Sequence, residues 1–185
     1  MAAFVANVGV NAAHRVESPL FEDGTFVLYP IPEHQVWAHP MRQLPDVWGD
    51  RAVHLDPDLD GDPPTYGDNC RTAGRAFSLR RAEPGDVIVF LARLRPRSGE
   101  HPAFYLVGSP AVGAWNSFWV FRGDGRSRFY DRAVPFRRVE ADHVFGRAWT
   151  WREGRTELQT IGSYTRAVRR LTGTAERRLG ELVRP

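Results

Sequence analysis

The sequence contains no lysine, because all 25 of its basic residues are arginine. Without a lysine amine the chain cannot form the usual imine to pyridoxal phosphate, and it has no Walker-type lysine to hold a nucleoside triphosphate. The single cysteine, Cys70, cannot form an intrachain disulfide, and no Cys pair or His-x₃-His spacing offers zinc ligands. We therefore expect neither a cofactor nor a metal ion.

Long apolar runs are also missing, and no stretch approaches the roughly 20 residues that a membrane-spanning helix needs. The first residues, MAAFVANVGVNAAH, lack the basic start, apolar stretch and cleavage site of a secretory signal, so we expect a cytoplasmic protein without membrane contact. With 185 residues and 42% hydrophobic residues, the chain suits one folded domain over residues 1–185. Nothing in the sequence calls for an obligate protein partner.

Charge is distributed unevenly along the chain. Residues 1–70 contain three Arg and eleven acidic residues, whereas residues 71–185 contain twenty-two Arg and eleven acidic residues. A basic part of this kind is typical of a protein that binds the phosphates of nucleic acid, although a basic surface with no such partner has the same composition. The predicted DNA-binding residues stand where the basic part begins: Arg71, Arg75, Arg80 and Arg81.

Hydrophobic patterning favours a single α+β domain with a mixed, barrel-like sheet and short flanking helices. Strands are expected at residues 3–10, 25–31, 86–94 and 103–109, with weaker candidates near 117–121 and 143–149. Between these strands, the sequence predicts a helix over residues 71–81 with Ala73, Ala76 and Phe77 on one side, and then a turn over residues 83–86. One or two helices are expected after residue 163.

Candidate catalytic residues lie in the N-terminal segment, where Glu22 and Asp23 enter the expected second strand. A buried carboxylate could activate water or stabilise the cation that forms when a glycosidic bond breaks, and Asn11 and His14 of the same segment are further catalytic candidates. The alternative is a plain turn with solvated acids and a structural histidine. The acidic string over residues 56–62 resembles a calcium loop, but its twelfth position is Gly67 and its prolines disfavour the flanking helices.

Aromatic residues form another group of candidates. The sequence has six Trp, and they stand beside Arg, Asn or His residues rather than in apolar runs: Trp37, Trp48, Trp115, Trp119, Trp149 and Trp151. Such side chains can stack on a base that has left the helical stack, or they can simply pack in the core.

Four segments together resemble the nucleotide-modification-associated domain 3 family: residues 6–33 (ANVGVNAAHRVESPLFEDGTFVLYPIPE), 65–68 (TYGD), 84–94 (PGDVIVFLARL) and 103–109 (AFYLVGS). The resemblance implies a function linked to modified bases of phage and bacterial DNA, and similar members include anti-phage glycosylases that excise glucosylated hydroxymethylcytosine. The strand after residue 86 also resembles PUA-type readers of modified bases, which suggests a PUA-like fold. Residues predicted to bind the substrate are Asn7, Glu17, Phe21, Glu33, Tyr66 and Asp68.

The residues and the resemblance together predict a DNA glycosylase that excises a modified base, with α-glucosylated hydroxymethylcytosine of phage DNA as the expected substrate. Its partner is expected to be DNA that carries modified bases. A non-catalytic reader of modified bases and a base-modifying transferase are the alternatives. Since no lysine is present to form an imine with the sugar, we expect a monofunctional enzyme that leaves an uncut abasic strand.

Overall fold

A mixed six-stranded sheet organises the fold in the computed structural model, which describes residues 1–32, 46, 53–54, 56–115 and 120–184. Its strands follow the order β10 (Arg128–Pro135), β7 (Ala103–Ser109), β6 (Val87–Pro96), β1 (Ala3–Val8) and β11 (Arg169–Leu171), and β2 (Ser18–Leu20) also pairs with β6. β1 and β2 run parallel to β6, whereas the other pairs are antiparallel. The predicted α+β class with short helices is confirmed, and the sheet is open rather than closed into a barrel.

Both faces of this sheet are apolar. Successive side chains along a strand point to opposite sides, so a continuous apolar run places apolar side chains on both faces. In β1, Phe4, Ala6 and Val8 belong to one buried cluster. Ala3 and Val5 belong to a second cluster on the other face. β6 and β7 alternate in the same way, so each face needs its own covering layer.

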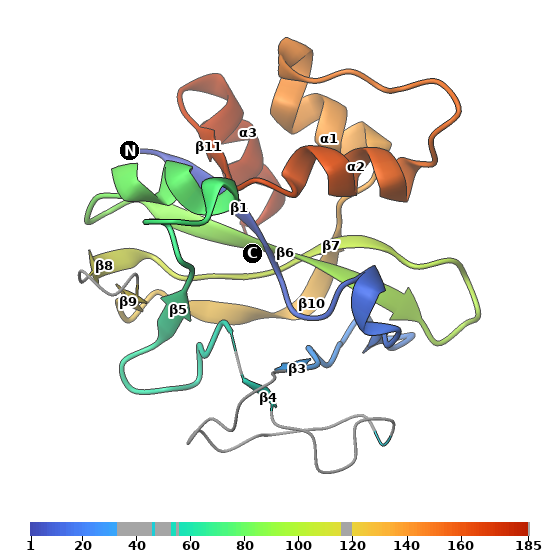
Figure 1. Ribbon diagram of the computed structural model, residues 1–185, viewed down its shortest axis with the longest axis horizontal. Helices are drawn as coiled ribbons and strands as arrows, with labels where there is room; N and C mark the ends of the chain where they lie inside the picture. Colours follow the sequence, from blue (N-terminus) through green and yellow to red (C-terminus); the bar gives the residue numbers. More distant parts are fainter. Residues whose placement is uncertain (33–45, 47–52, 55, 116–119, 185) are drawn as a thin grey trace.

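Three helices cover one face: α1 (Arg138–Phe145), α2 (Glu157–Thr165) and α3 (Thr174–Leu182). Their side chains Phe145, Ile161 and Leu179 are buried against the sheet. In the view of Figure 1 these helices lie above the strands of the main sheet, while the short β3–β4 pair lies below them. Of the helices expected after residue 163, α3 is confirmed, whereas α2 begins earlier, at Glu157, and Arg169–Leu171 form the strand β11 instead of a helix.

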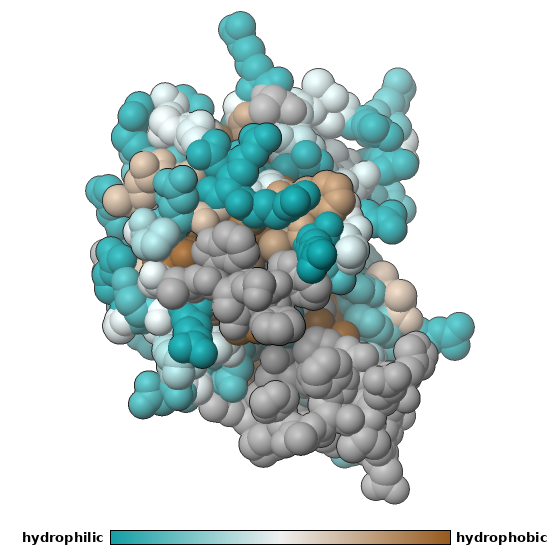
Figure 2. Space-filling view, turned by 60° about the vertical axis from the view of Figure 1, so that its left-hand side comes forward, coloured by the Kyte–Doolittle hydropathy of each residue, from teal (hydrophilic) through white to brown (hydrophobic). Residues whose placement is uncertain are grey.

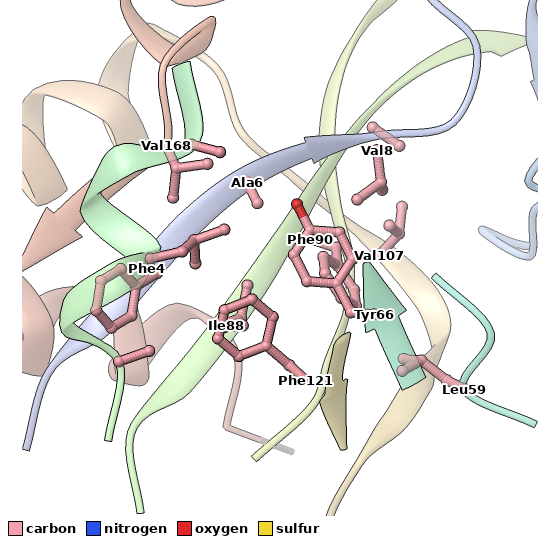
Figure 3. Packing of buried hydrophobic residues seen from close by; sticks show 14 of the residues in the cluster. Phe4, Ala6, Val8, Leu59, Tyr66, Ile88, Phe90, Val107, Phe121 and Val168 are labelled. Atoms are coloured by element: carbon pink, nitrogen blue, oxygen red, sulfur yellow. The ribbon is translucent and has the colours of Figure 1, made fainter. Parts of the chain in front are cut away.

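A 3₁₀ helix and a small second sheet cover the other face. η3 (Gly74–Arg81) confirms the helix expected at 71–81 and buries Ala76 and Leu79, but Phe77 is 45% exposed instead of facing the core. The second sheet has the order β5 (Thr65–Gly67), β9 (Val120–Gly123) and β8 (Val112–Trp115). Figure 3 shows Tyr66 of β5 and Phe121 of β9 beside Phe90 and Ile88 of β6.

β1 leaves the sheet at Gly9, and this change shapes the site. Gly9 has a φ of 69°, and a Cβ there would lie 2.6 Å from Leu28 Cδ1, so the chain turns away where only glycine fits. The intervening loop holds η1 (Ala12–His14), after which β2 takes the same edge of β6 opposite Leu94–Pro96.

The strand expected at residues 25–31 is wrong. Phe26 makes only an isolated bridge to Leu20, and the short β3 (Ile31–Pro32) pairs with β4 (Val53–His54). The Val27 N–H donates to the Pro19 carbonyl oxygen at 3.2 Å and the Phe21 N–H donates to the Thr25 carbonyl oxygen at 2.8 Å, so these residues contact the β2 segment at one bridge only. Residues 27–30 belong to no strand.

The strand expected near 143–149 is also wrong, because these residues end α1 and form η4 (Gly146–Ala148). Ala141, Val144 and Phe145 are buried at helical spacing, and the Glu140 carboxylate accepts a hydrogen bond from the Arg137 backbone N–H at 2.8 Å. The strand expected at 117–121 overlaps β9 only from residue 120, since 117–119 lie outside the described residues.

β10 contains a wide bulge. Phe129 faces Gly108 of β7, whereas Val134 faces Leu106, so residues 130–133 loop out of the ladder. The Ala133 N–H donates to the Gly24 carbonyl oxygen at 2.9 Å. The bulge is thereby held against the turn that precedes residues 25–30.

Candidate functional site

A pocket of about 280 Å³ opens where three distant chain segments meet: residues 25–30, residues 56–60 and residues 129–131 of the β10 bulge. Phe26, Leu28 and Phe129 contribute apolar surface that continues into the core. Tyr29 and Tyr130 add further aromatic lining. The volume lies just below the roughly 300–1,000 Å³ typical of small-ligand sites.

Four carboxyl groups line this pocket, and they differ in exposure. Asp60 and Asp131 are exposed, whereas Asp56 and Asp58 are partly buried. Asp56 Oδ1 accepts a hydrogen bond from the Gly67 backbone N–H at 2.9 Å. An apolar, aromatic chamber with acids of unequal exposure is suited to acid–base chemistry on an uncharged ring.

Burial raises the pKa of the Asp56 carboxyl from 3.8 to about 8, and the nearby Asp68 carboxylate adds to this rise. The Gly67 N–H and the Arg75 guanidinium lower the pKa and offset part of it. At neutral pH Asp56 is therefore mostly protonated and can donate a proton. A carboxyl group in this state inside a pocket is a candidate general acid.

A polar network of Tyr66, Asp68 and Arg75 lies close to Asp56. The Tyr66 hydroxyl donates to Asp68 Oδ2 at 3.2 Å, and Arg75 Nη2 forms an ion pair with Asp68 Oδ1 at 3.1 Å. Burial, and next the Asp68 charge, raise the pKa of Tyr66 well above 10, so its hydroxyl remains a donor. Tyr66 and Asp68, both predicted to bind substrate, thus lie next to the pocket rather than among the residues that line it.

Asp56→Asn is expected to change how stability depends on pH. Between about pH 4 and pH 8 the folded protein keeps a proton that the unfolded chain has released, so the wild-type free energy of unfolding falls by about 1.4 kcal/mol per pH unit from this group. The variant lacks this loss, and its Tm should rise relative to wild type between pH 5 and pH 9. Thermal unfolding at both pH values, with the exposed Asp62→Asn as control, measures the difference. A Tm difference independent of pH would contradict the assignment.

The residues predicted in the segment 6–33 do not form one cluster. Asn7 is exposed on the face of β1 that the helices cover, opposite the cluster that borders the pocket. Asn11 caps η1, its Oδ1 accepting from Ala13 N–H at 2.9 Å while its own N–H donates to His14 Nδ1 at 3.0 Å. Glu17 forms ion pairs with Arg93 and Arg95. The substrate and catalytic roles assigned to these residues remain predictions.

Glu22 and Asp23 lie in an exposed turn, so the expectation that one of them is buried is wrong. Asp23 Oδ1 accepts from both the backbone N–H and the hydroxyl of Thr25, and these hydrogen bonds lower the pKa of Asp23. A shallow hollow beside the turn also contains Phe21, and the Arg97 guanidinium lies 5.8 Å from the centre of its ring. Thr25 lines both this hollow and the pocket, so the turn forms the pocket rim.

The four predicted DNA-binding arginines are exposed in or just before η3. Arg75 is held by Asp68, whereas Arg80 lies 5.7 Å from the ring centre of Phe77. Figure 2 turns the η3 side of the molecule forward, and its described surface is mainly hydrophilic with only small separate apolar areas. Their contact with DNA stays a prediction, and Glu33 lies outside the described residues.

The sequence interpretation missed the residues that line the pocket. Asp56, Asp58 and Asp60 belong to the acidic string that resembles a calcium loop, and Asp131 is one of the eleven acidic residues of the basic part of the chain and belongs to no motif. Among the Trp candidates, Trp149 is buried with the helices, and Trp151 packs partly buried against the same cluster. Trp37, Trp48 and Trp119 lie outside the described residues, as does the side chain of Trp115.

Within the described part of the chain, no three His, Cys, Asp or Glu side chains come close enough together to hold a metal ion. The pocket carboxyl groups are thus spread around a chamber instead of converging on one point. Nor does any helix in the described ranges combine the length and apolar character needed to cross a membrane.

The sequence profile of the family described as nucleotide modification associated domain 3 matches residues 3–117. The matched range includes residues 25–30 and 56–60 of the pocket but ends before the β10 bulge and the three α-helices. Searches of the curated proteins and of the solved structures found no match. The suggested likeness to PUA-type readers therefore stays a prediction.

Proposed function

The chain belongs to the nucleotide modification associated domain 3 family, and from this premise we propose that it is a DNA glycosylase that removes a modified base. The family is described by its association with nucleotide modification. The finer assignment is supported above all by one observation: a carboxyl group with a pKa raised to about 8 lines an aromatic pocket that also contains exposed carboxylates. Glucosylated hydroxymethylcytosine in phage DNA is the proposed substrate, and antiviral defence the proposed role.

Hydrolysis of the bond between sugar and base fits these groups. Asp56 donates its proton to the base as the bond from C1′ breaks and its electron pair passes to the base. Positive charge then develops on the deoxyribose, and the carboxylates of Asp58 and Asp131 provide negative charge in the same pocket. One of them accepts a proton from the water that attacks C1′. The products are a free base and an intact strand with an abasic site.

The charges around the pocket suit a base that is turned out of duplex DNA. The acidic lining repels phosphates and favours the neutral base and its cationic sugar. Arg128 precedes the bulge that contributes the lining, and Arg132 lies within it. The aromatic walls can stack on the extruded base. The pocket would thus receive the base while arginines outside it hold the backbone.

The experiment incubates the protein with phage DNA that contains glucosylated hydroxymethylcytosine and follows strand breaks by alkaline electrophoresis. We expect breaks only after alkali or heat, a free modified base in solution, and no covalent adduct after borohydride, because the chain has no lysine to form an imine. Unchanged DNA that still binds the protein would indicate a reader. A reaction that requires an added donor would indicate a transferase, and either result would overturn the proposal.

Binding to DNA is expected to weaken steeply with salt. Replacing Arg80 and Arg81 together by Ala should weaken binding to all sequences alike and flatten the slope of log K against log salt by about one unit per lost contact. Arg177→Ala on α3 is the control, because α3 covers the opposite face of the sheet. Filter binding from 50 to 300 mM salt gives the slopes, and equal slopes for wild type and the double variant would place the DNA elsewhere.

A further inference from the structure

A second pocket, of about 260 Å³, lies on the helical face of the sheet, outside the range that matches the family. Its lining comes from Trp149, the loop before α2, α2 itself and Arg169 of β11. The proposed base pocket borders the buried cluster on the other face. The two pockets are thus separated by the main sheet.

Positive charge dominates this second pocket, because Arg152, Arg155 and Arg169 line it and none of the other described lining residues is acidic. Arg152 and Arg155 are exposed, and neither guanidinium has an ion-pair or hydrogen-bond partner among the described residues. The neighbouring Arg137 and Arg138, by contrast, pair with Glu157 and Asp142. Unpaired guanidiniums around a concave site are an arrangement that attracts an anion.

Arg169 is fixed in place at the edge of this pocket. Its guanidinium carbon lies 4.0 Å from the ring centre of Tyr164, and its Nε donates to the Tyr164 carbonyl oxygen at 2.6 Å. These contacts use one face of the guanidinium and one of its nitrogens, and in the part of the chain that the structure describes its two Nη groups form no hydrogen bond. Arg169 is therefore held in position while its terminal donors remain for a ligand.

Trp149 lines the pocket with a buried indole ring. It is only 7% exposed and packs against Trp151 and Tyr164, with ring centres 4.6 Å and 5.4 Å away. Its buried Nε1–H has no acceptor among the described residues, whereas the Trp151 Nε1–H donates to Asp142 at 2.7 Å. A buried N–H without an acceptor costs about 1–3 kcal/mol. Nε1 itself has almost no accessible surface, so a ligand oxygen would reach this N–H only after neighbouring side chains move.

We propose that this pocket binds a phosphate ester. Arg152 and Arg155 are the principal ligands, Arg169 is a positioned third cation, and Ser163 contributes a hydroxyl donor at the pocket wall. Guanidinium groups match the oxygens of phosphate in paired hydrogen bonds. Three of them favour a multiply charged anion over a carboxylate, and Glu153, which lies between Arg152 and Arg155 in the sequence, is not among the described residues that line the pocket. The ester can come from a free nucleotide or from a nucleic acid strand. The site does not rest on the proposed glycosylase activity.

The test measures binding of dCMP, deoxycytidine and a short single-stranded oligonucleotide by calorimetry at low salt. The variant is Arg152→Ala with Arg155→Ala, and the control is Arg166→Ala with Arg170→Ala, which removes the same charge from nearby exposed arginines that do not line the pocket. We expect deoxycytidine not to bind, and the first double variant to weaken binding of a phosphate-bearing probe at least tenfold with the control within twofold. Of the four replaced residues, only Arg170 lies in a strand, β11. The Tm of each double variant, compared with that of wild type, checks that it folds.

The two sources of the ester give different results. If dCMP binds through Arg152 and Arg155, the ligand is a free nucleotide, and if only the oligonucleotide does, it is a strand. Equal binding by wild type and the variant for both probes would overturn the proposal, as would dCMP binding that is lost in Asp56→Asn instead. If Asp56→Asn loses base excision but still binds the phosphate probe, the second pocket is independent of the proposed glycosylase site. The two proposals can therefore fail separately.

Discussion

Asp56→Asn is expected to lower the rate of base excision at pH 7 by about 10²–10³-fold, with DNA affinity nearly unchanged. Asparagine keeps an acceptor for the Gly67 N–H but cannot give a proton to the departing base. Single-turnover assays on DNA that contains the modified base measure the chemical step directly. Asp62→Asn makes the same substitution at an exposed residue of the same loop outside the pocket and should leave the rate within about twofold.

The pH profile adds a second measure of the same role. Because burial raises the pKa of Asp56 to about 8, the wild-type rate should fall as pH rises through 8, while the residual rate of Asp56→Asn should show no such fall. Glu22→Gln and Asp23→Asn in the same assay test the earlier assignment to the rim turn. A 10²–10³-fold loss in either of them with full activity in Asp56→Asn would move the chemistry from the pocket to the turn.

Phe90→Ala is expected to lower the free energy of unfolding by about 3–5 kcal/mol. Phe90 is fully buried in β6, and its ring meets the Tyr66 ring edge-on with centres 4.9 Å apart. The substitution removes this contact and leaves a cavity between the main sheet and β5, which also supports the network behind Asp56. Urea denaturation measures the loss.

The matched control for Phe90 is Phe77→Ala in η3. Phe77 is 45% exposed and lies beside Arg80, so its loss should cost less than about 1 kcal/mol. Similar losses for both variants would mean that the face between β6 and the second sheet is not the tightly packed core described above.

Several elements could be predicted because their causes are local. The continuous apolar runs around Phe90 and Leu106 indicate strands buried on both faces, and Pro84 and Gly85 dictate the turn before the first of them. By contrast, Val144 and Phe145 suit either a strand or a helix, and the burial of Ala141 with them decides for the helix. The segment around Phe26 has the composition of a strand, but its pairing with the β2 segment is limited to one bridge.

The candidate site depended on contacts that sequence spacing does not reveal. Asp131 joins Asp56 in one pocket only because the β10 bulge lies against the turn at Gly24. The raised pKa of Asp56 results from burial among residues far along the chain, whereas Glu22 and Asp23, which are adjacent in a conspicuous motif, remain exposed. Exposure sets the protonation of a carboxyl group, and tertiary packing sets exposure.

By itself, the sequence determined the α+β class, the division into an acidic and a basic part, and the exclusion of imine chemistry at a lysine, because these follow from composition and local patterning. Only the tertiary structure decided which acid is buried, which face of the sheet each candidate occupies, and where the unpaired arginines gather. Those properties arise when distant segments pack together, and the free energy of burying or pairing a charge depends on that packing rather than on the residue itself.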